Sequence, residues 1–214
     1  IKKIVNITLL FIAKRLTEIF GFLVFSLGII LLISLISYSP EDPNFIFPEN
    51  TEIKNLLGYR GSYISDIFFQ SIGLISYLIT LTLVFTGINI ILRKDFFLII
   101  ENIFYSILYS ILGSLFLSNF YNTTFALFIN GNGGFIGNYL NENFFKSLIV
   151  LNENISYYFL IILIIGFFLL SVNFSPKKFF NFLKKINFLN FKNNKNYTDK
   201  SEVINEYIPQ EEIK

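Results

Sequence analysis

Four long runs of apolar residues constrain the fold of this chain more than any other feature. They cover residues 19–38, 67–92, 96–119 and 155–174, and Glu101 is the one charged residue among them. An α-helix rises about 1.5 Å per residue, so roughly 20 residues cross the hydrocarbon core of a bilayer. The runs are too long and too uniformly apolar for the strands of a membrane barrel. The sequence therefore predicts an all-α membrane protein with four transmembrane helices.

Composition supports a membrane protein and excludes several kinds of active site. Of the 214 residues 53% are hydrophobic, and the mean hydropathy is +0.59. A soluble domain of this size needs more polar residues to cover its surface. The chain contains no Cys and no His, so it cannot form a disulfide, a catalytic thiolate or a histidine-based metal site. We expect no cofactor and no metal on this chain.

The basic residues predict how the helices are oriented. Of the 17 Lys and Arg residues, 14 lie before the first run, between the second and third runs, or after the fourth. Basic residues are enriched in cytoplasmic segments, so we expect both termini in the cytoplasm and residues 39–66 and 120–154 outside it. Residues 1–18 reach Lys14 and Arg15 instead of a small-residue cleavage site. We therefore expect a basic amphipathic segment on the inner leaflet, not a cleaved signal peptide.

The stretch SYSPEDPNF, residues 37–45, ends the first apolar run. Tyr38 falls where an aromatic residue is expected at the membrane–water interface. The next residues resemble the start of a helix, with a serine cap, Pro40 in the first turn and two acids near the positive end of the helix dipole. Pro43 limits such a helix to about one turn. A plain stop and turn explains the same residues, and the physical argument alone favours it.

A second cluster, NLLGYRGSYISD at residues 55–66, leads into the second apolar run. Gly58 and Gly61 permit a tight reversal, and Ser62 is a candidate cap for the helix that follows. A single helix from Ser62 to Leu92 would be about 46 Å long. Such a helix must tilt in the bilayer or project beyond it.

The glycine-rich stretch NGNGGFIGNYL, residues 130–140, invites comparison with phosphate-binding loops. It has no Gly-Lys pair at the required spacing and no preceding strand, so we reject that interpretation. The pattern predicts a turn followed by an extracytoplasmic helix on the membrane surface. Its apolar face comprises Phe135, Ile136, Tyr139, Leu140, Phe144, Phe145, Leu148 and Ile149. Its polar face comprises Asn138, Asn141, Glu142 and Lys146. A fifth span is disfavoured because two of those residues carry charge.

Polar residues inside the third run suggest helix packing. Ser106, Ser110 and Ser114 recur every four residues, so they form one stripe that allows close helix contact. Chance placement of serine explains the stripe equally well. Glu101 lies close enough to the start of the run to reach the inner interface or to pair with Arg93 or Lys94.

The residues after the fourth run fall into two segments. Residues 175–192 are basic and aromatic, which is typical of a helix lying on the inner leaflet. Residues 193–214 are polar without an apolar period, which is typical of the start of a disordered linker.

Taken together, these motifs resemble the N-terminal four-helix membrane domain of the FtsK/SpoIIIE family of bacterial DNA translocases. The resemblance covers roughly residues 15–175, and it depends on the order of the motifs more than on any single one. The matching residues are Ser37, Tyr38, Pro40, Asp42 and Pro43 after the first helix, Gly58 and Gly61 before the second, and Gly133, Gly134 and Gly137 between the third and fourth.

The resemblance implies a role in cell division and chromosome partition. Such a domain anchors a motor at the division septum of the inner membrane and works with other division proteins. A linker then leads to a hexameric ATPase that pumps DNA, so a homo-oligomer is implied and DNA would be contacted through the motor alone. This chain contains no Walker A sequence. We therefore expect no ATPase activity in it, either because it is a fragment or because the motor is encoded elsewhere.

Two other function classes compete with a division anchor. A small polytopic transporter or channel subunit normally places ionisable groups at mid-membrane, often on broken helices. No charged residue lies in the middle of a run, and no run contains proline. A membrane enzyme would need His, Cys or paired carboxylates at one site, and the sequence offers no such group. The division anchor is the favoured function.

Overall fold

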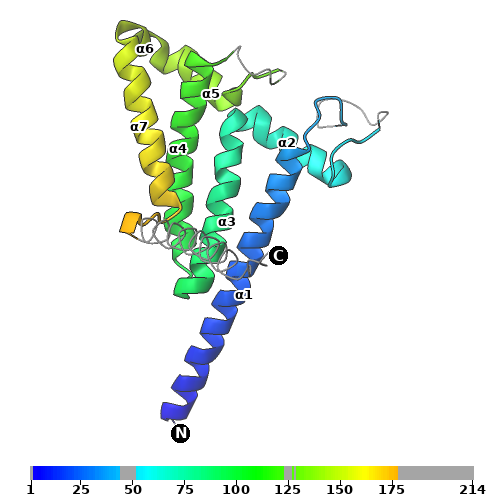
Figure 1. Ribbon diagram of the computed structural model, residues 1–214, viewed down its shortest axis with the longest axis vertical. Coiled ribbons are helices and arrows are strands. Elements are labelled where there is room, and N and C mark those ends of the chain that lie inside the picture. The colour runs from blue at the N-terminus through cyan, green and yellow to red at the C-terminus, as the bar shows by residue number, and fades with distance from the viewer. Residues whose placement is uncertain (1, 44–51, 123–126, 128, 178–214) are drawn as a thin grey trace, which may run out of the picture. The chain divides into compact units, whose positions relative to one another are not determined.

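The computed structural model of the chain describes residues 2–43, 52–122, 127 and 129–177. The chain divides into two units, residues 1–173 and 174–214, and the helical bundle belongs to the first. Every regular element in the described residues is a helix (Figure 1). This confirms the predicted all-α class. The predicted juxtamembrane helix at 175–192 and the linker at 193–214 lie outside the described residues, apart from positions 175–177.

The helices follow one another in the order α1 to α7, with two short non-α segments. The bounds are α1 Lys2–Ile36, α2 Gly58–Ile72, the 3₁₀ segment η1 Gly73–Ile75, α3 Ser76–Arg93, α4 Leu98–Phe120, α5 Gly134–Leu140, the π-helical segment η2 Asn141–Phe145, α6 Lys146–Leu151 and α7 Glu153–Ser171. By length and composition, four stretches of the described chain can cross a membrane. They are Asn6–Ile36, Gly58–Arg93, Leu98–Phe120 and Glu153–Ser171, which confirms four predicted spans.

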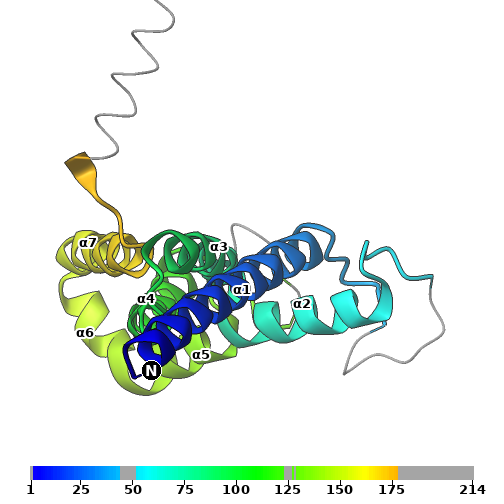
Figure 2. The same cartoon turned by 90° about the horizontal axis from the view of Figure 1, so that it is seen from below.

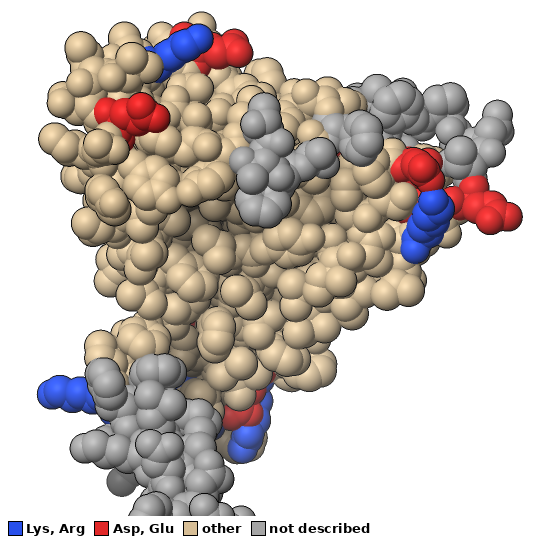
Figure 3. All heavy atoms as spheres, turned by 45° about the horizontal axis from the view of Figure 1, so that its top comes forward, with Lys and Arg blue, Asp and Glu red and all other residues tan. Residues whose placement is uncertain are grey.

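The long helices stand side by side in the order α1, α3, α4, α7, with α1 packed mainly on α3 and α4 mainly on α7 (Figures 1 and 2). α2, α5 and α6 lie at the end of the bundle where α1 finishes and α7 begins, and we call this the loop end. In the view of Figure 3, charged side chains gather at the two ends of the bundle, and the described surface between them is uncharged. That distribution suits a bundle whose middle faces hydrocarbon.

Glycines allow α1 and α3 to approach very closely. A Cβ atom added at Gly28 would lie 2.8 Å from the backbone nitrogen of Val84, and one added at Gly87 would lie 2.5 Å from that of Phe25. Gly21 contacts the same part of α3. Small residues at helix contacts are the usual means of bringing membrane helices together. The signal in the sequence is the spacing of seven residues between Gly21 and Gly28, and the sequence interpretation overlooked it.

The N-terminal residues continue the first membrane helix without a break. α1 is continuous from Lys2, and its side chains from Asn6 to Leu16 are exposed. No Pro or Gly occurs before Gly21, so nothing in the sequence ends the helix near residue 18. The helix boundary therefore differs from the predicted division between residues 1–18 and 19–38.

The second apolar run is not one helix, contrary to the prediction. α2 begins at Gly58, four residues before the expected cap, and ends at Ile72. Gly73 then has φ +67°, a conformation that suits glycine and interrupts the helix. α3 begins only at Ser76. The break explains how the 36 residues Gly58–Arg93 are accommodated without one continuous helix, which would be about 54 Å long.

Candidate functional site at the loop end

Asp42 connects the end of α1 to the start of α2. Its side chain is 1% exposed. Its Oδ1 accepts the backbone N–H of Lys54 at 2.8 Å and its Oδ2 accepts that of Asn55 at 2.9 Å. A carboxylate that accepts two N–H groups forms strong, charge-assisted bonds. The predicted turn is present, because Asp42 N–H donates to the carbonyl of Ser39 at 3.2 Å. The described residues thus have the stop and turn that the physical argument favoured, and no helix begins at Ser39.

Further buried hydrogen bonds complete this junction. The Asn55 amide donates to the carbonyl of Ser34 at 2.9 Å, and the Ser34 hydroxyl donates to the carbonyl of Gly61 at 2.6 Å. The Ser62 hydroxyl donates to the carbonyl of Pro43 at 2.8 Å. Ser62 lies inside α2, so the prediction that it caps the helix is wrong. A Cβ atom at Gly61 would lie 2.2 Å from the Asn55 side-chain oxygen. Gly61 is therefore required for close packing, not for a reversal.

Gly58 does serve a turn, since its φ is +66° and its N–H donates to the carbonyl of Asn55 at 2.9 Å. Ser37 extends the junction on the other side. Its hydroxyl donates to the carbonyl of Ile33 at 2.7 Å and accepts the N–H of Leu56 at 3.1 Å. Pro40 lies in the turn that follows. The five motif residues that follow the first helix thus lie at or beside the junction; they are Ser37, Tyr38, Pro40, Asp42 and Pro43.

Tyr38 packs against α2 instead of standing free at the interface. Its ring centroid lies 4.8 Å from that of Phe69, and its hydroxyl donates to Asp66 Oδ1 at 3.3 Å. Burial raises the pKa of Tyr38 to about 12, and the negative charge of Asp66 adds to the shift. Asp66 itself is 2% exposed. The phenol is therefore neutral at physiological pH and donates a hydrogen bond to the buried Asp66 carboxylate.

An exposed ion pair borders the same junction. Lys54 Nζ donates to Glu41 Oε2, and this contact lowers the pKa of the Glu41 carboxyl and raises the pKa of the Lys54 amine. Both side chains are mostly exposed. Exposed pairs contribute little to stability, so Asp42 and not Glu41 holds the junction.

The glycine-rich stretch docks on the break in the second span. The N–H of Leu74 donates to the carbonyl of Asn132 at 2.9 Å, and the Ser114 hydroxyl donates to the carbonyl of Ile72 at 2.9 Å. These bonds satisfy backbone groups that the interrupted helix leaves without a partner. Asn132 and Ser114 therefore supply partners for backbone groups at the break.

The three motif glycines make this docking possible. A Cβ atom at Gly133 or Gly137 would lie 2.4 or 2.2 Å from the carbonyl oxygen of Ser114. One at Gly134, whose φ is +66°, would lie 2.6 Å from the backbone nitrogen of Gly73. The Gly-Gly-x-x-Gly pattern thus provides contact between backbones at a helix break.

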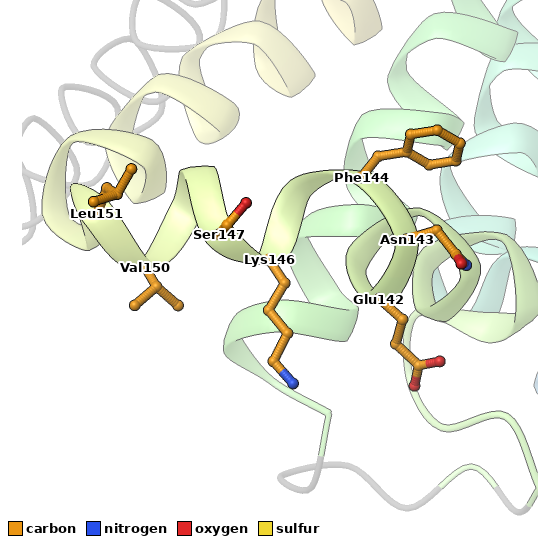
Figure 4. Close-up of a pocket in the computed structure, with 7 residues that line it drawn as sticks. All are labelled: Glu142, Asn143, Phe144, Lys146, Ser147, Val150 and Leu151. Atoms are coloured by element: carbon orange, nitrogen blue, oxygen red, sulfur yellow. The ribbon is translucent and has the colours of Figure 1, made fainter.

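The segment after the glycines differs from the prediction in three respects. It is divided into α5, the π-helical segment η2 and α6 instead of forming one regular helix. The side-chain oxygen of Asn141 is buried, with no partner among the described residues. The third difference is at Asn138. Asn138 was placed on the exposed polar face, but its side chain accepts from Ser118 at 2.6 Å and donates to the carbonyl of Asn130 at 2.7 Å. Glu142 and Lys146 are exposed, as predicted for the polar face. Figure 4 shows both projecting from the same side as Val150, whereas Phe144 projects from the opposite side. These residues line a shallow surface hollow of about 570 Å³.

The three serines of the stripe on α4 differ in burial and in hydrogen-bond partners. Ser114 is fully buried and bonds to the helix break, as described above. Ser110 is buried, and its hydroxyl has no partner among the described residues. Ser106 bonds to the carbonyl of Ile103 in its own helix.

A second polar network lies at the opposite end of the bundle, and the sequence interpretation missed it. Asn102 Nδ2 donates to Thr86 Oγ1 at 2.8 Å, and Asn102 Oδ1 accepts from Asn173. Arg93 donates to Asn173 Oδ1 at 2.8 Å. Lys94 pairs with Glu18 at 2.6 Å. Among the ion pairs of the described residues, none joins Glu101 to Arg93 or Lys94, so that suggested pairing is not formed there.

The same network reaches deeper into the bundle. The Thr82 hydroxyl lies 2.9 Å from the hydroxyl of Tyr109 and 3.0 Å from that of Ser171. These contacts connect α3, α4 and the last turn of α7. The sequence signal is the pair Thr82 and Thr86, which lie one turn apart on α3. Within the described residues, no group of three or more acidic side chains could hold a metal ion.

The fold and these contacts define a multi-pass membrane domain. The two loops that carry the sequence motifs pack against the ends of its helices at the loop end. A family model described as the 4TM region of DNA translocase FtsK/SpoIIIE matches residues 13–186. The chain belongs to this family, and its four spans make it a multi-pass inner-membrane protein.

Known relatives point to the same family. A DNA translocase FtsK of Azospirillum brasilense is 33% identical over 87 residues, which is 40% of this chain and 14% of that protein. DNA translocases FtsK of Rickettsia typhi and Caulobacter vibrioides are 35% and 33% identical over 32% and 35% of this chain. In each of these two, the match spans 9% of the relative's length. The comparison with solved structures found no match.

Proposed function

We propose that this chain is the membrane anchor of a septal DNA translocase that acts in cell division and chromosome segregation. It scaffolds other division proteins through its loop end and tethers a cytoplasmic ATPase motor that is not part of these 214 residues. The observation that carries the proposal is the family match over residues 13–186. The names of the relatives support it, since each is called a DNA translocase.

The proposed orientation places both ends of the chain in the cytoplasm. Its support is the uneven distribution of basic residues, 14 of which lie on the proposed cytoplasmic side. An even number of spans returns the chain to the side on which it began, as a tether to a cytoplasmic motor requires.

Cysteine labelling tests the orientation directly, because the chain has no cysteine of its own. Single cysteines at Leu56 and at Leu92 place a reporter at each end of the bundle, and both side chains are at least 72% exposed. We expect a membrane-impermeant maleimide added to intact spheroplasts to label Leu56→Cys and not Leu92→Cys. The reverse pattern would overturn the proposed orientation.

The loop end offers exposed apolar residues for a division partner. Leu56 is 77% exposed and Tyr59 is 45% exposed. Neither side chain is a hydrogen-bonding member of the Asp42 junction. We expect Leu56→Ser with Tyr59→Ser, in the full-length tagged protein, to reduce septal localisation while the protein still inserts. Val150→Ser is the matched control, since Val150 is 69% exposed at the same end. Unchanged localisation and division in the double variant would contradict the scaffold.

A small transporter or channel subunit is the alternative, and the helix break at Gly73 is the observation that favours it. Broken helices often line substrate sites in transporters. Here the break lies against Asn132 and Ser114, which occupy its free backbone groups. Solute or ion flux in reconstituted vesicles separates the two functions, because an anchor produces none.

A further inference from the structure

An apolar groove opens between α1, α2 and α3 near the loop end. It has a volume of about 460 Å³, within the usual range of ligand pockets of about 300–1,000 Å³. Its lining includes Leu27, Ile30, Leu31, Ile64 and Leu83, with Arg60 as its one charged member. Leu27, Ile30, Leu31, Ile64 and Leu83 belong to helices that can cross a membrane, so in a bilayer this part of the groove would face lipid.

The groove has a polar end and an apolar end. Gly61, next to Arg60, is held level with Ser34 by the hydrogen bond from the Ser34 hydroxyl to the Gly61 carbonyl. Ser34 lies two residues before the end of α1, whereas Leu27 lies about 10 Å deeper along the same helix. Arg60 therefore lies where span and loop meet, and the apolar lining continues from it toward the centre of the bundle.

Arg60 is free to bind an anion. Its side chain is exposed, and it forms no ion pair within the described part of the chain. A guanidinium stays charged at all physiological pH values, and its planar fork of donors matches the oxygens of a phosphate. A single cation at the mouth of an apolar groove is complementary to a molecule with one anionic head and a long apolar chain.

We propose that this groove binds one anionic phospholipid, with the phosphate on Arg60 and an acyl chain along α1. The depth of about 10 Å equals only two turns of helix, which is too short for a docked transmembrane helix of a second copy. A lipid needs no more than this depth, because the rest of its chain can continue into the bilayer.

The test measures which lipid the intact chain retains. The protein is reconstituted into vesicles of phosphatidylglycerol and phosphatidylcholine in equal amounts, extracted in mild detergent and weighed by native mass spectrometry. We expect one retained phosphatidylglycerol per chain. Arg60→Gln is expected to lower its retention roughly tenfold, in line with the loss of a hydrogen bond to a charged group. Arg60→Lys keeps the charge but loses the fork, so it should retain an intermediate amount.

Two further variants make the result specific. Lys146→Gln removes an exposed cation at the same end but away from the groove, and it should retain lipid like the wild type. Ile30→Trp fills the groove while Arg60 stays in place, and it should lower retention. Equal retention of the two lipids, or equal effects of Arg60→Gln and Lys146→Gln, would overturn the proposal. So would a disulfide-linked dimer formed through Leu27→Cys, because a second copy would then occupy the groove.

Discussion

Asp42 is the residue on which the junction between α1 and α2 depends most. Its buried carboxylate accepts two backbone N–H groups, from Lys54 and Asn55. In Asp42→Asn, an amide NH₂ must face one of these donors, so one bond is lost and a buried donor remains unpaired. We expect a loss of about 1–3 kcal/mol in the stability of the junction. Hydrogen exchange of the Lys54 and Asn55 amides measures this loss as faster exchange.

Glu41→Gln is the matched control, because it removes the neighbouring carboxylate from an exposed pair. Its exchange rates should stay close to those of the wild type. If the two variants exchange alike, burial of Asp42 is not what stabilises the junction.

The raised pKa of Tyr38 predicts how the stability of the loop end depends on alkaline pH. Its pKa is raised to about 12, first by burial and then by the negative charge of Asp66. A phenol whose folded pKa exceeds its unfolded value of about 10 stabilises the fold fully below pH 10. This contribution is lost as pH rises through about 12. Difference absorbance between wild type and Tyr38→Phe should show the Tyr38 ionisation near pH 12. An ionisation near pH 10 would mean that Tyr38 is not packed against Asp66.

Among the elements, the break between α2 and α3 is the most sensitive to substitution. Gly73 has φ +67°, and a Cβ atom there would lie 1.8 Å from the Asn132 carbonyl oxygen. We expect Gly73→Ala to cost about 1–3 kcal/mol in backbone strain alone, and more through displacement of the Asn132 segment. Equilibrium unfolding in mixed micelles, followed by circular dichroism, measures the loss.

Gly166 provides a control of opposite sign within the same protein. It lies inside α7, and nothing is within 4 Å of an added Cβ atom. Gly166→Ala should therefore leave stability unchanged or raise it by about 0.5–1 kcal/mol, as expected for alanine in a helix interior. Equal losses at Gly73 and Gly166 would show that the break has no special role.

The elements also show what the sequence could and could not predict. The four spans could be predicted because each contains a long apolar run, and a backbone that crosses hydrocarbon must satisfy its own polar groups, which a helix does. The break at Gly73 could not, because it depends on the Asn132 segment, which is 59 residues away in the chain. Asn138 was misplaced for a similar reason. Its partner Ser118 belongs to another helix, and periodicity within one helix cannot reveal it.

At the scale of the whole molecule, the polar network opposite the loop end ties the last residues of the bundle to the neighbouring helices. Residues Ser171, Val172 and Asn173 are bonded to α3 and α4 through Thr82, Asn89 and Asn102. Under the proposed function, a motor would pull on the chain just beyond Asn173. Bonds to two other helices would distribute that load over the bundle and would protect α7 from unwinding at its end.

Replacing Asn102 tests this role of the network. Asn102 is 1% exposed and joins Thr86 to Asn173. Asn102→Leu leaves the buried Thr86 hydroxyl without this partner, at a cost of about 1–3 kcal/mol, and removes the bond between Asn102 and Asn173. The segment after α7 should therefore open more often. A cysteine at Val172, which is 9% exposed, reports such opening as faster maleimide labelling. Ser106→Ala, which removes a bond within α4 alone, should label like the parent. Equal labelling in all three proteins would mean that α7 holds its own end without help from α3 and α4.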